Sequence, residues 1–409
     1  MSNLDTIKKI EAHVGSPFYV MNPDQYESNV RAFTDAFRRN YDRIIIGYSF
    51  KTNYVPALCI RAKRLGCYAE VVSEMEMDIA LRIGFEKIIF NGPIKRQNAL
   101  IRAIKHQAII NIDAEYEVDF LCQYKKEHPD AEIKAGIRLN IMLVDKNGNS
   151  VVQNGLRSGR FGFPYDILAK NITRLRDAGI RIVSVHGHTS SSDRAVVNYQ
   201  VITSYMLRIC EDFSLNDIEF FDIGGGFFGA APEGLDLTNR PKYEDYANIV
   251  VDCLKKSGWF NRCLPYIVIE PGSSVVSNVF KYYTKVYQLK RINGKNFAMV
   301  DGTVFDVKPT MHSNNLPHSV ISESVEDESE IYDVVGSTCM EKDIMLREVS
   351  LPKLKIGDFM EFRGVGAYTI SLTPTFINYL SPIVTIENET INVVRRKQQI
   401  DDVLNIYKL

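Results

Sequence analysis

The sequence predicts the α/β fold class, with a (β/α)8 TIM barrel followed by a C-terminal, mostly β domain. Eight short, β-branched apolar segments recur up to about residue 275, and segments with helical periodicity separate them. Strands that are apolar throughout are typical of parallel sheets buried on both faces. Eight such strands alternating with helices indicate a (β/α)8 barrel. Beyond residue 275, strand-and-turn patterns replace the helical segments.

The predicted barrel strands occupy residues 43–51, 67–73, 87–92, 108–113, 133–140, 180–190, 218–226 and 265–272. The segments between them, such as SEMEMDIALRIGF, carry apolar residues at helical spacing. The gap between the fifth and sixth strands is longer than the others. We therefore expect residues 142–163 to form a loop insertion over one end of the barrel.

The second domain is predicted from five strand-rich segments, at residues 279–294, 296–305, 329–336, 358–371 and 382–396. The N-terminal stretch SPFYVMN either adds a strand to this domain or leads into the barrel. We expect three parts: an N-terminal segment (1–24), a barrel (25–275) and a β domain that completes the active site (276–409).

Composition excludes several classes of protein. A net charge of −1 without a long basic run argues against nucleic acid as a partner. The sequence has no apolar stretch of membrane-spanning length and no signal-peptide core at its start. Seven scattered cysteines without a CxxC pair fit a reduced setting better than a disulfide framework or a structural zinc site. We expect a cytoplasmic protein.

Polar residues gather where the barrel strands end, and in this fold those ends form the active-site face. They are Lys51, Glu70, Arg138, Asn140, His186, His188, Ser190–Ser192, Gly224, Gly225, Gly226, Glu270 and Gly272. Glycines without Cβ atoms let backbone N–H groups approach an anion closely. A phosphate site after the seventh strand is one interpretation of the three glycines, and a tight turn is the other.

Lys51 and Glu270 have the chemistry that one cofactor requires. A partly desolvated lysine has a lowered pKa and can form a Schiff base with an aldehyde. Pyridoxal phosphate (PLP) needs such a lysine, a phosphate cradle and a partner for its ring nitrogen. Glu270 suits the ring nitrogen. Singly, Lys51 fits a solvated lysine and Glu270 a structural acceptor, but their order with His188 and the glycines favours PLP.

Several motifs resemble those of the fold-type III PLP-dependent decarboxylases, the family of diaminopimelate and ornithine decarboxylases, whose barrel is alanine-racemase-like. They are AEVVSEME, with Glu70 where the family usually has aspartate, and YSFKTN, GRFGF, HGHTSSS, FDIGGGF and EPGSS. The resemblance implies that Lys51 holds PLP, His188 stacks on the ring and Ser191 helps hold the phosphate. It implies a cofactor site that also includes Arg138, Gly224, Gly225, Gly226, Glu270, Gly272 and Ser273.

The second domain carries further motifs of this family: MVDGTVFDVKP, GSTCMEKD and VGAYTISLTPTF. By resemblance, Asp301 lies near the substrate and Tyr368 contacts the PLP phosphate. Cys339 would cross the interface of a homodimer and donate a proton in the partner's active site. Taken alone, Cys339 also fits a small buried residue.

Two departures from the family bear on the substrate. Ser273 follows EPG where most members have an arginine that helps bind phosphate or a substrate carboxylate. Met340 follows the matched cysteine where an acidic residue usually reads a distal ammonium, and a thioether cannot do this. Glu341 or Asp343 could substitute. Lys308 either holds a substrate carboxylate or is a surface lysine.

We therefore expect a decarboxylase that acts on an amino-acid group of a larger molecule in specialised biosynthesis, such as a carrier protein or a nucleotide–peptide. Three alternatives stay open. One is decarboxylation of free diaminopimelate, ornithine or lysine. Another is an amino-acid racemase, although alanine racemase types place arginine rather than a carboxylate such as Glu270 at the pyridine nitrogen. The third is a binding protein that has lost PLP.

Overall fold

The computed structural model describes residues 3–235, 238–323 and 328–408. The chain divides into two compact units. The barrel unit comprises Glu27–Gly229 and Asn239–Val275, and the β unit comprises Met1–Tyr26, Ala230–Thr238 and Val276–Leu409.

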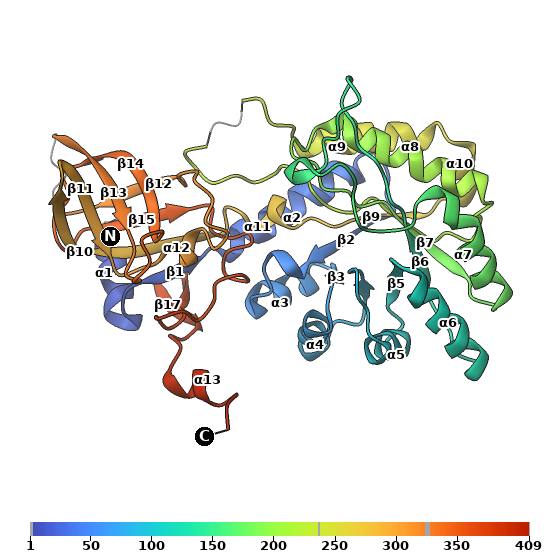
Figure 1. Cartoon of the computed structure of the whole chain (residues 1–409), viewed down its shortest axis with the longest axis horizontal. Helices are drawn as coiled ribbons and strands as arrows, with labels where there is room; N and C mark the ends of the chain where they lie inside the picture. The colour runs from blue at the N-terminus through green and yellow to red at the C-terminus, as the bar shows by residue number, and fades with distance from the viewer. Residues whose placement is uncertain (1–2, 236–237, 324–327, 409) are drawn as a thin grey trace. The chain divides into compact units, whose positions relative to one another are not determined.

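Eight parallel strands of the barrel unit close into a barrel in chain order (Figure 1). They are β2 (Ile44–Ser49), β3 (Tyr68–Val71), β4 (Ile88–Phe90), β5 (Ile109–Ile112), β6 (Ala135–Arg138), β7 (Ile182–His186), β8 (Phe220–Asp222) and β9 (Tyr266–Ile269). Closure comes from pairing of β2 with β9, in which Ile45 faces Val268. The isoleucines and valines fill the interior, as in the cluster of Ile45, Ile89, Ile109 and Val268. The predicted fold class is confirmed.

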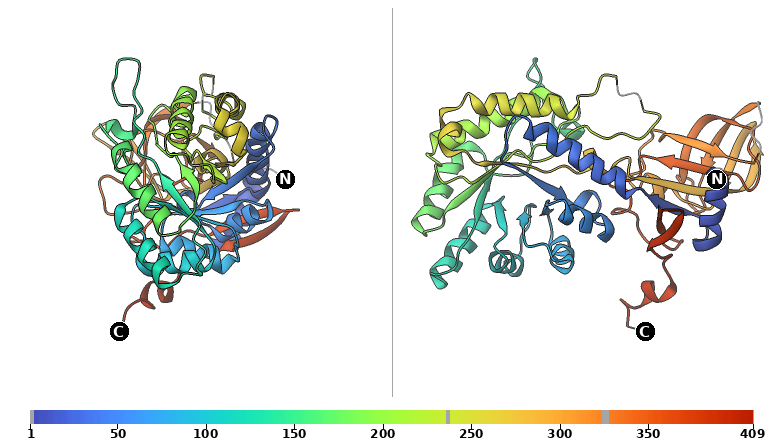
Figure 2. Two further views of the ribbon diagram at one scale, coloured as in Figure 1. Left: turned by 90° about the vertical axis from the view of Figure 1, so that its right-hand side faces the viewer. Right: turned by 180° about the vertical axis from the view of Figure 1, so that it is seen from behind.

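Helices cover the outside of the barrel strands (Figures 1 and 2). They are α2 (Pro23–Arg38), which begins in the β unit, α3 (Pro56–Arg64), α4 (Glu74–Ile83), α5 (Gln97–Lys105), α6 (Glu115–Glu127), α7 (Tyr165–Asp177), α8 (Val196–Asp212), α9 (Tyr243–Lys255), α10 (Gly258–Cys263) and the short α11 (Ser273–Val276). Local chemistry sets their ends. In α4, the Ser73 side chain accepts the amide of Glu76, and Gly84 ends the helix in the left-handed conformation that favours glycine.

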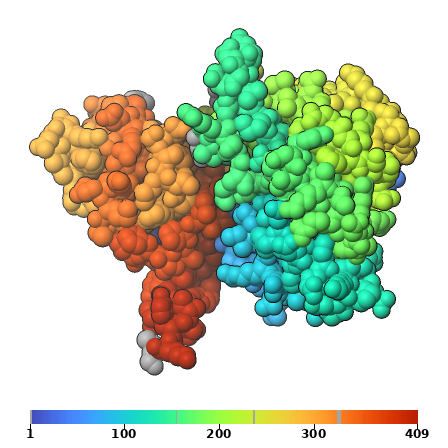
Figure 3. All heavy atoms as spheres, turned by 45° about the vertical axis from the view of Figure 1, so that its right-hand side comes forward, coloured from blue at the N-terminus to red at the C-terminus, as the bar shows by residue number. Residues whose placement is uncertain are grey.

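The segment 142–163 is a loop insertion in the barrel unit, as expected, and part of it projects from the unit's surface (Figure 3). Its tip is an Asx turn in which the Asp145 carboxylate accepts the amides of Asn147 and Asn149. A short 3-10 turn, η2 (Gln153–Gly155), follows. Val152 forms an isolated bridge with Ser191, so the insertion contacts the segment that follows β7.

A nine-stranded sheet forms the β unit. Its strands are β1 (Phe18–Met21), β10 (Phe280–Ile292), β11 (Lys295–Val300), β12 (His318–Ile321), β13 (Ser329–Val335), β14 (Ile344–Pro352), β15 (Phe359–Arg363), β16 (Ile383–Glu387) and β17 (Thr390–Arg395), with helices α1 (Asn3–Val14), α12 (Val304–Val307) and α13 (Ile400–Leu404). β1 pairs antiparallel with β10 and parallel with β16, so the SPFYVMN stretch adds a strand to this unit. Sequence analysis did not predict β12, which is short, or β14, which charged residues interrupt.

A search of the described residues finds no helix that is both long and apolar enough to cross a membrane.

A buried ion pair reinforces the barrel beside its carboxyl end. Lys95 and Glu117 are fully buried with 2.9 Å between Nζ and Oε2, and Lys95 also donates to the carbonyl of Gly92. Glu117 in turn accepts the backbone amide of Asp113. Burial lowers the pKa of Lys95 and raises that of Glu117, and each group's attraction for the other opposes these shifts. The pair therefore stays charged only while it stays intact.

We expect Lys95→Met to lower the free energy of unfolding by about 3–5 kcal/mol, because it leaves the Glu117 carboxylate buried without its cation. Lys95→Met/Glu117→Gln removes both charges while keeping an acceptor for the Asp113 amide, and it should recover most of the loss. Urea unfolding followed by circular dichroism measures this. Lys170→Met is the matched control, since its ion pair with Glu115 is exposed to solvent and contributes little to stability. Equal effects of Lys95→Met and Lys170→Met would contradict the prediction.

Candidate active site at the carboxyl end of the barrel

Lys51 lies in the 3-10 turn η1 (Phe50–Thr52), directly after β2. Its Nζ is 2.7 Å from Oε2 of Glu70, which lies in the neighbouring strand β3. The Glu70 side chain is fully buried, whereas 32% of the Lys51 side chain is exposed. The amine is thus held at the carboxyl end of the barrel by a buried carboxylate, on a side chain that is partly exposed.

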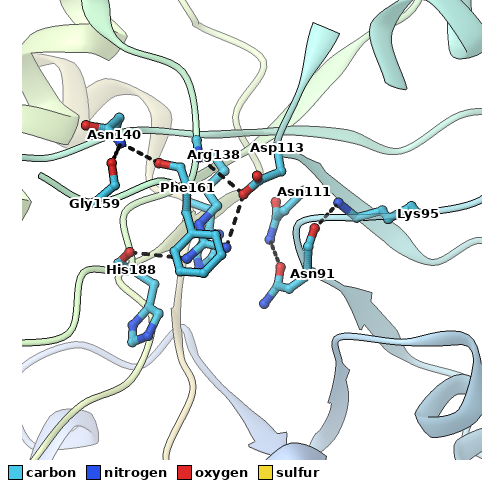
Figure 4. Close-up of polar contacts among 12 residues, drawn as sticks. Asn91, Lys95, Asn111, Asp113, Arg138, Asn140, Gly159, Phe161 and His188 are labelled. Carbon is cyan, nitrogen blue, oxygen red and sulfur yellow. Dashed lines mark hydrogen bonds and ion pairs between the residues drawn. The ribbon is translucent and has the colours of Figure 1, made fainter. Parts of the chain in front are cut away.

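Asn91, at the end of β4, links two acidic groups of the site. Its Nδ2 donates to Glu70 Oε1 at 3.0 Å and to Glu270 Oε1 at 2.6 Å. Its Oδ1 accepts from Asn111, which in turn accepts from Ser184. Figure 4 shows Asn91 and Asn111 meeting inside the barrel. Sequence analysis missed this ladder, and its only local sign was asparagine within otherwise apolar strand segments.

Glu270 follows β9 and is buried with Asp222 and His186. Its Oε2 lies 3.5 Å from Nε2 of His186. Burial and the neighbouring Glu270 raise the pKa of Asp222 well above its ordinary value. Burial opposes ionisation of Glu270 too, but the close polar contact with His186 and the charge of Lys51 outweigh it and hold the pKa of Glu270 below the usual range. Glu270 is therefore the ionised member of the carboxyl pair.

His188 is half-buried, and its ring lies parallel to that of His186 with 6.3 Å between centroids. The backbone N–H of Gly225 donates to its Nδ1 at 3.1 Å. Burial, with smaller contributions from Arg138 and Lys51, lowers the pKa of His188 to about 3. The imidazole is neutral at physiological pH and presents a flat apolar face.

The glycine segment after β8 leaves no room for side chains. A Cβ on Gly224 would lie 2.4 Å from His188 Cβ, and one on Gly225 would lie 2.3 Å from the Glu270 carbonyl oxygen. Gly224 and Gly226 have φ of +72° and +94°. Gly272 is equally constrained, because its Cβ would meet Thr52. Glycine backbone N–H groups without side chains, next to Ser191 and Ser273, can approach a bound phosphate closely. This arrangement favours the phosphate interpretation over the simple-turn interpretation.

Arg138, at the end of β6, is held by Asp113 with 3.2 Å between Nη1 and Oδ1, and its guanidinium packs on the ring of Phe161 (Figure 4). Asp113 also accepts the amide of Gly162, which ties the loop insertion to the barrel. A cavity of about 180 Å³ opens here in the barrel unit, lined by Arg138, Asn140, Ile141, Val152, Gln153, Leu156, Gly159, Arg160, Phe161, His188, Thr189 and Ser190. The predicted barrel residues thus gather at one end of the barrel.

The remaining predicted residues belong to the β unit. Asp301 accepts from Thr284 and from the Lys285 amide through Oδ1, whereas its buried Oδ2 has no hydrogen-bond partner among the described residues. Lys308 is 2% exposed, so the surface-lysine alternative is wrong. Burial lowers the pKa of Lys308.

The GSTCMEKD segment forms a turn held by Asp343, which is buried and accepts the amides of Val304 and Thr338. Cys339 is exposed, so the buried-cysteine alternative does not hold in this chain. Met340 is half-buried in the same turn. Tyr368 is 41% exposed and has φ of +52°.

A lysine at the end of the first barrel strand, a bare glycine segment and a buried ionised glutamate define a PLP-binding barrel enzyme. Residues 27–277 match the family model described as pyridoxal-dependent decarboxylase, pyridoxal binding domain, so the chain belongs to this family. It is a PLP-dependent carboxy-lyase, which confirms the predicted enzyme class and cofactor.

Relatives cover nearly the whole chain. The diaminopimelate decarboxylase of Methanocaldococcus jannaschii is 27% identical over 376 residues, 88% of this chain and 84% of that protein. The probable chloroplastic diaminopimelate decarboxylase of Oryza sativa subsp. japonica is 26% identical over 410 residues, 96% and 79% of the two chains. The crystal structure of Helicobacter pylori diaminopimelate decarboxylase complexed with L-lysine has a TM-score of 0.85, 24% identity and 98% coverage of each chain. This structural likeness supports the fold.

The two neutral histidines predict how stability depends on pH. Burial lowers the pKa of His186 as well as that of His188. Below about pH 6.5, these two histidines therefore bind protons more readily in the unfolded chain than in the folded chain. The free energy of unfolding of the PLP-free protein should therefore fall as pH decreases from about 6.5 towards 3. Each histidine contributes at most about 1.4 kcal/mol per pH unit, and the partly exposed His188 contributes less.

His188→Phe should flatten this slope, whereas the exposed His106→Gln should leave it unchanged. Urea unfolding at pH 7, 6 and 5 measures the slopes. A slope for His188→Phe equal to that of the parent protein would show that His188 can be protonated without cost in the folded state.

Proposed function

We propose that this chain removes the α-carboxylate of a free amino acid, with PLP as cofactor. The observation that carries the proposal is the chain of contacts that runs from the Lys51 amine through Glu70 and Asn91 to the buried, ionised Glu270. The names of the relatives favour the alternative of a free amino acid over a substrate carried on a larger molecule. We therefore do not retain the carrier-linked hypothesis.

The residues divide the work between them. PLP supplies an electron sink that accepts the electron pair of the bond to the departing carboxylate. Lys51 would hold the cofactor, and Glu70 orients its amine. Glu270 would hold a proton at the ring nitrogen, and the hydrogen bond from Asn91 fixes the orientation of its carboxylate. A carboxylate in this role favours decarboxylation over racemisation, because it strengthens the electron sink.

The neutral His188 offers a stacking face for the ring, and its Nδ1 bond from Gly225 fixes the orientation of the imidazole. The glycine segment and Ser191 hold the phosphate through short-range donors. Arg138 is immobilised by Asp113 and Phe161, so its charge stays at the site without a flexible side chain. These groups would position the cofactor.

We further propose that the substrate is a diamino acid with a distal carboxylate, of which diaminopimelate is the example in the names of the relatives. Asp301 supports this, because its unpartnered buried Oδ2 can accept from an ammonium group. Lys308, a buried cation, can pair with a carboxylate. Met340 can bind neither an ammonium group nor a carboxylate. If Asp301 binds the ammonium group, however, no acidic residue is needed at position 340.

Release of CO2 from free amino acids tests the reaction. We expect turnover of meso-diaminopimelate at least about tenfold faster than that of L-lysine or L-ornithine, which lack the distal carboxylate. Lys308→Met should remove this preference without removing PLP. Glu270→Gln should slow CO2 release by about 100-fold or more while PLP still binds. The reaction assignment fails if Glu270→Gln keeps normal turnover, or if the substrate racemises without losing CO2.

We also propose that the chain works as a homodimer with shared active sites. The exposed Cys339 supports this, since a thiol at the surface of one chain is available to a neighbouring site. Cys339 would then protonate the α-carbon after CO2 leaves.

Mixing inactive Lys51→Ala with inactive Cys339→Ala should restore up to about a quarter of the activity, because a random mixed dimer has one intact site. Activity after exchange in mild urea measures this, with each variant alone as the control. Verified subunit exchange without recovered activity would remove the shared-site proposal.

A further inference from the structure

Arg194 is a cation that sequence analysis did not assign to the site. It lies between β7 and α8 in the barrel unit, with φ of +48°, a left-handed conformation that is uncommon for a residue with a side chain. Its backbone N–H donates to Ser191 Oγ at 3.1 Å, and its carbonyl accepts from the hydroxyl of Tyr246 at 2.7 Å. The backbone is thus fixed from both sides, which sets the direction of the side chain.

The guanidinium of Arg194 reaches the other two segments of the predicted phosphate cradle. Its Nη1 lies 3.3 Å from the Phe227 carbonyl oxygen, directly after the glycines, and 3.4 Å from Ser273 Oγ. Tyr246 strengthens the link, because its hydroxyl also accepts the amide of Phe228. One arginine therefore connects the serine, glycine and EPG segments.

No carboxylate among the described residues pairs with the guanidinium of Arg194. Arg138 and Lys95 are the comparable cations of this end of the barrel, and each pairs with an acidic partner. Within the part of the chain that the structure describes, Arg194 forms no ion pair, and its two side-chain hydrogen bonds are long and go to neutral oxygens. A half-buried guanidinium with weak neutral partners is well placed to bind an anion.

We propose that Arg194 binds the phosphate of PLP from the point where the serine, glycine and EPG segments meet. The EPG segment itself offers the neutral hydroxyl of Ser273, and the guanidinium that contacts this hydroxyl comes from the segment after β7. The inference rests on PLP as the cofactor and on the phosphate lying between these three segments. It is independent of which amino acid is decarboxylated.

PLP and pyridoxal, which lacks the phosphate, separate a contact with the phosphate from a purely structural role. The PLP-free protein is titrated with each compound, and binding is followed by the visible absorbance that appears on reaction with Lys51. Arg194→Ala should weaken PLP binding by about 10- to 100-fold and leave pyridoxal binding within about twofold. Arg194→Lys should retain part of the affinity. Arg208→Ala, an exposed arginine on α8, is the matched control with the same change in charge.

Moving the arginine gives a second, independent test. Arg194→Ala/Ser273→Arg should recover PLP affinity, because it returns a guanidinium to the cradle from the EPG segment. Equal losses of PLP and pyridoxal affinity in Arg194→Ala would overturn the proposal in favour of a structural role, and so would unchanged PLP affinity. Because the titration reads cofactor binding and not CO2 release, failure here is distinguishable from failure of the proposed decarboxylation.

Discussion

The site depends on how one end of the barrel accommodates buried carboxyl groups. Glu70, Asp222 and Glu270 are all shielded from water, and isolated buried charges are strongly unfavourable. Three features reduce this cost: Lys51 pairs with Glu70, Asn91 donates to Glu70 and Glu270, and the raised pKa of Asp222 favours its neutral form. The Lys51 amine and the Glu270 carboxylate therefore form one electrostatic unit, and neither can be placed without the other.

A second set of buried charged residues, near the ends of β4, β5 and β6, supports the site. Glu117 ties Lys95 to the backbone of Asp113, and the carboxylate of Asp113 holds Arg138 and the end of the loop insertion. Such pairs add little net stability, but they fix geometry because breaking one leaves a charge unpaired. The position of Arg138 beside His188 is therefore set by interactions that begin outside the site.

The fold and the strand-end residues could be predicted because both follow from local patterns. Apolar runs define strands, and the barrel rule places Lys51 and Glu270 at one end although they lie far apart in the chain. Asn91 could not be recognised in this way, since its meaning comes from partners on β3, β5 and the end of β9. Arg194 was missed for a related reason: a left-handed residue in a loop and a bond from Tyr246 direct its side chain, and neither has a sequence pattern.

The two proposed cofactor contacts, to the ring nitrogen and to the phosphate, differ in how strictly they constrain the position of the protein group. A ring nitrogen has one lone pair in one direction, so its partner must lie at a fixed point. Glu270, the proposed partner, follows a barrel strand and is held by Asn91. A phosphate presents three oxygens that accept hydrogen bonds from many directions, so its cation can approach from any neighbouring loop. The proposed phosphate contact of Arg194, which comes from a loop, uses this freedom, whereas a carboxylate at the ring nitrogen has no comparable freedom. Strand ends therefore suit a group that must lie in one fixed direction, and loops suit a group that can approach its ligand from several directions.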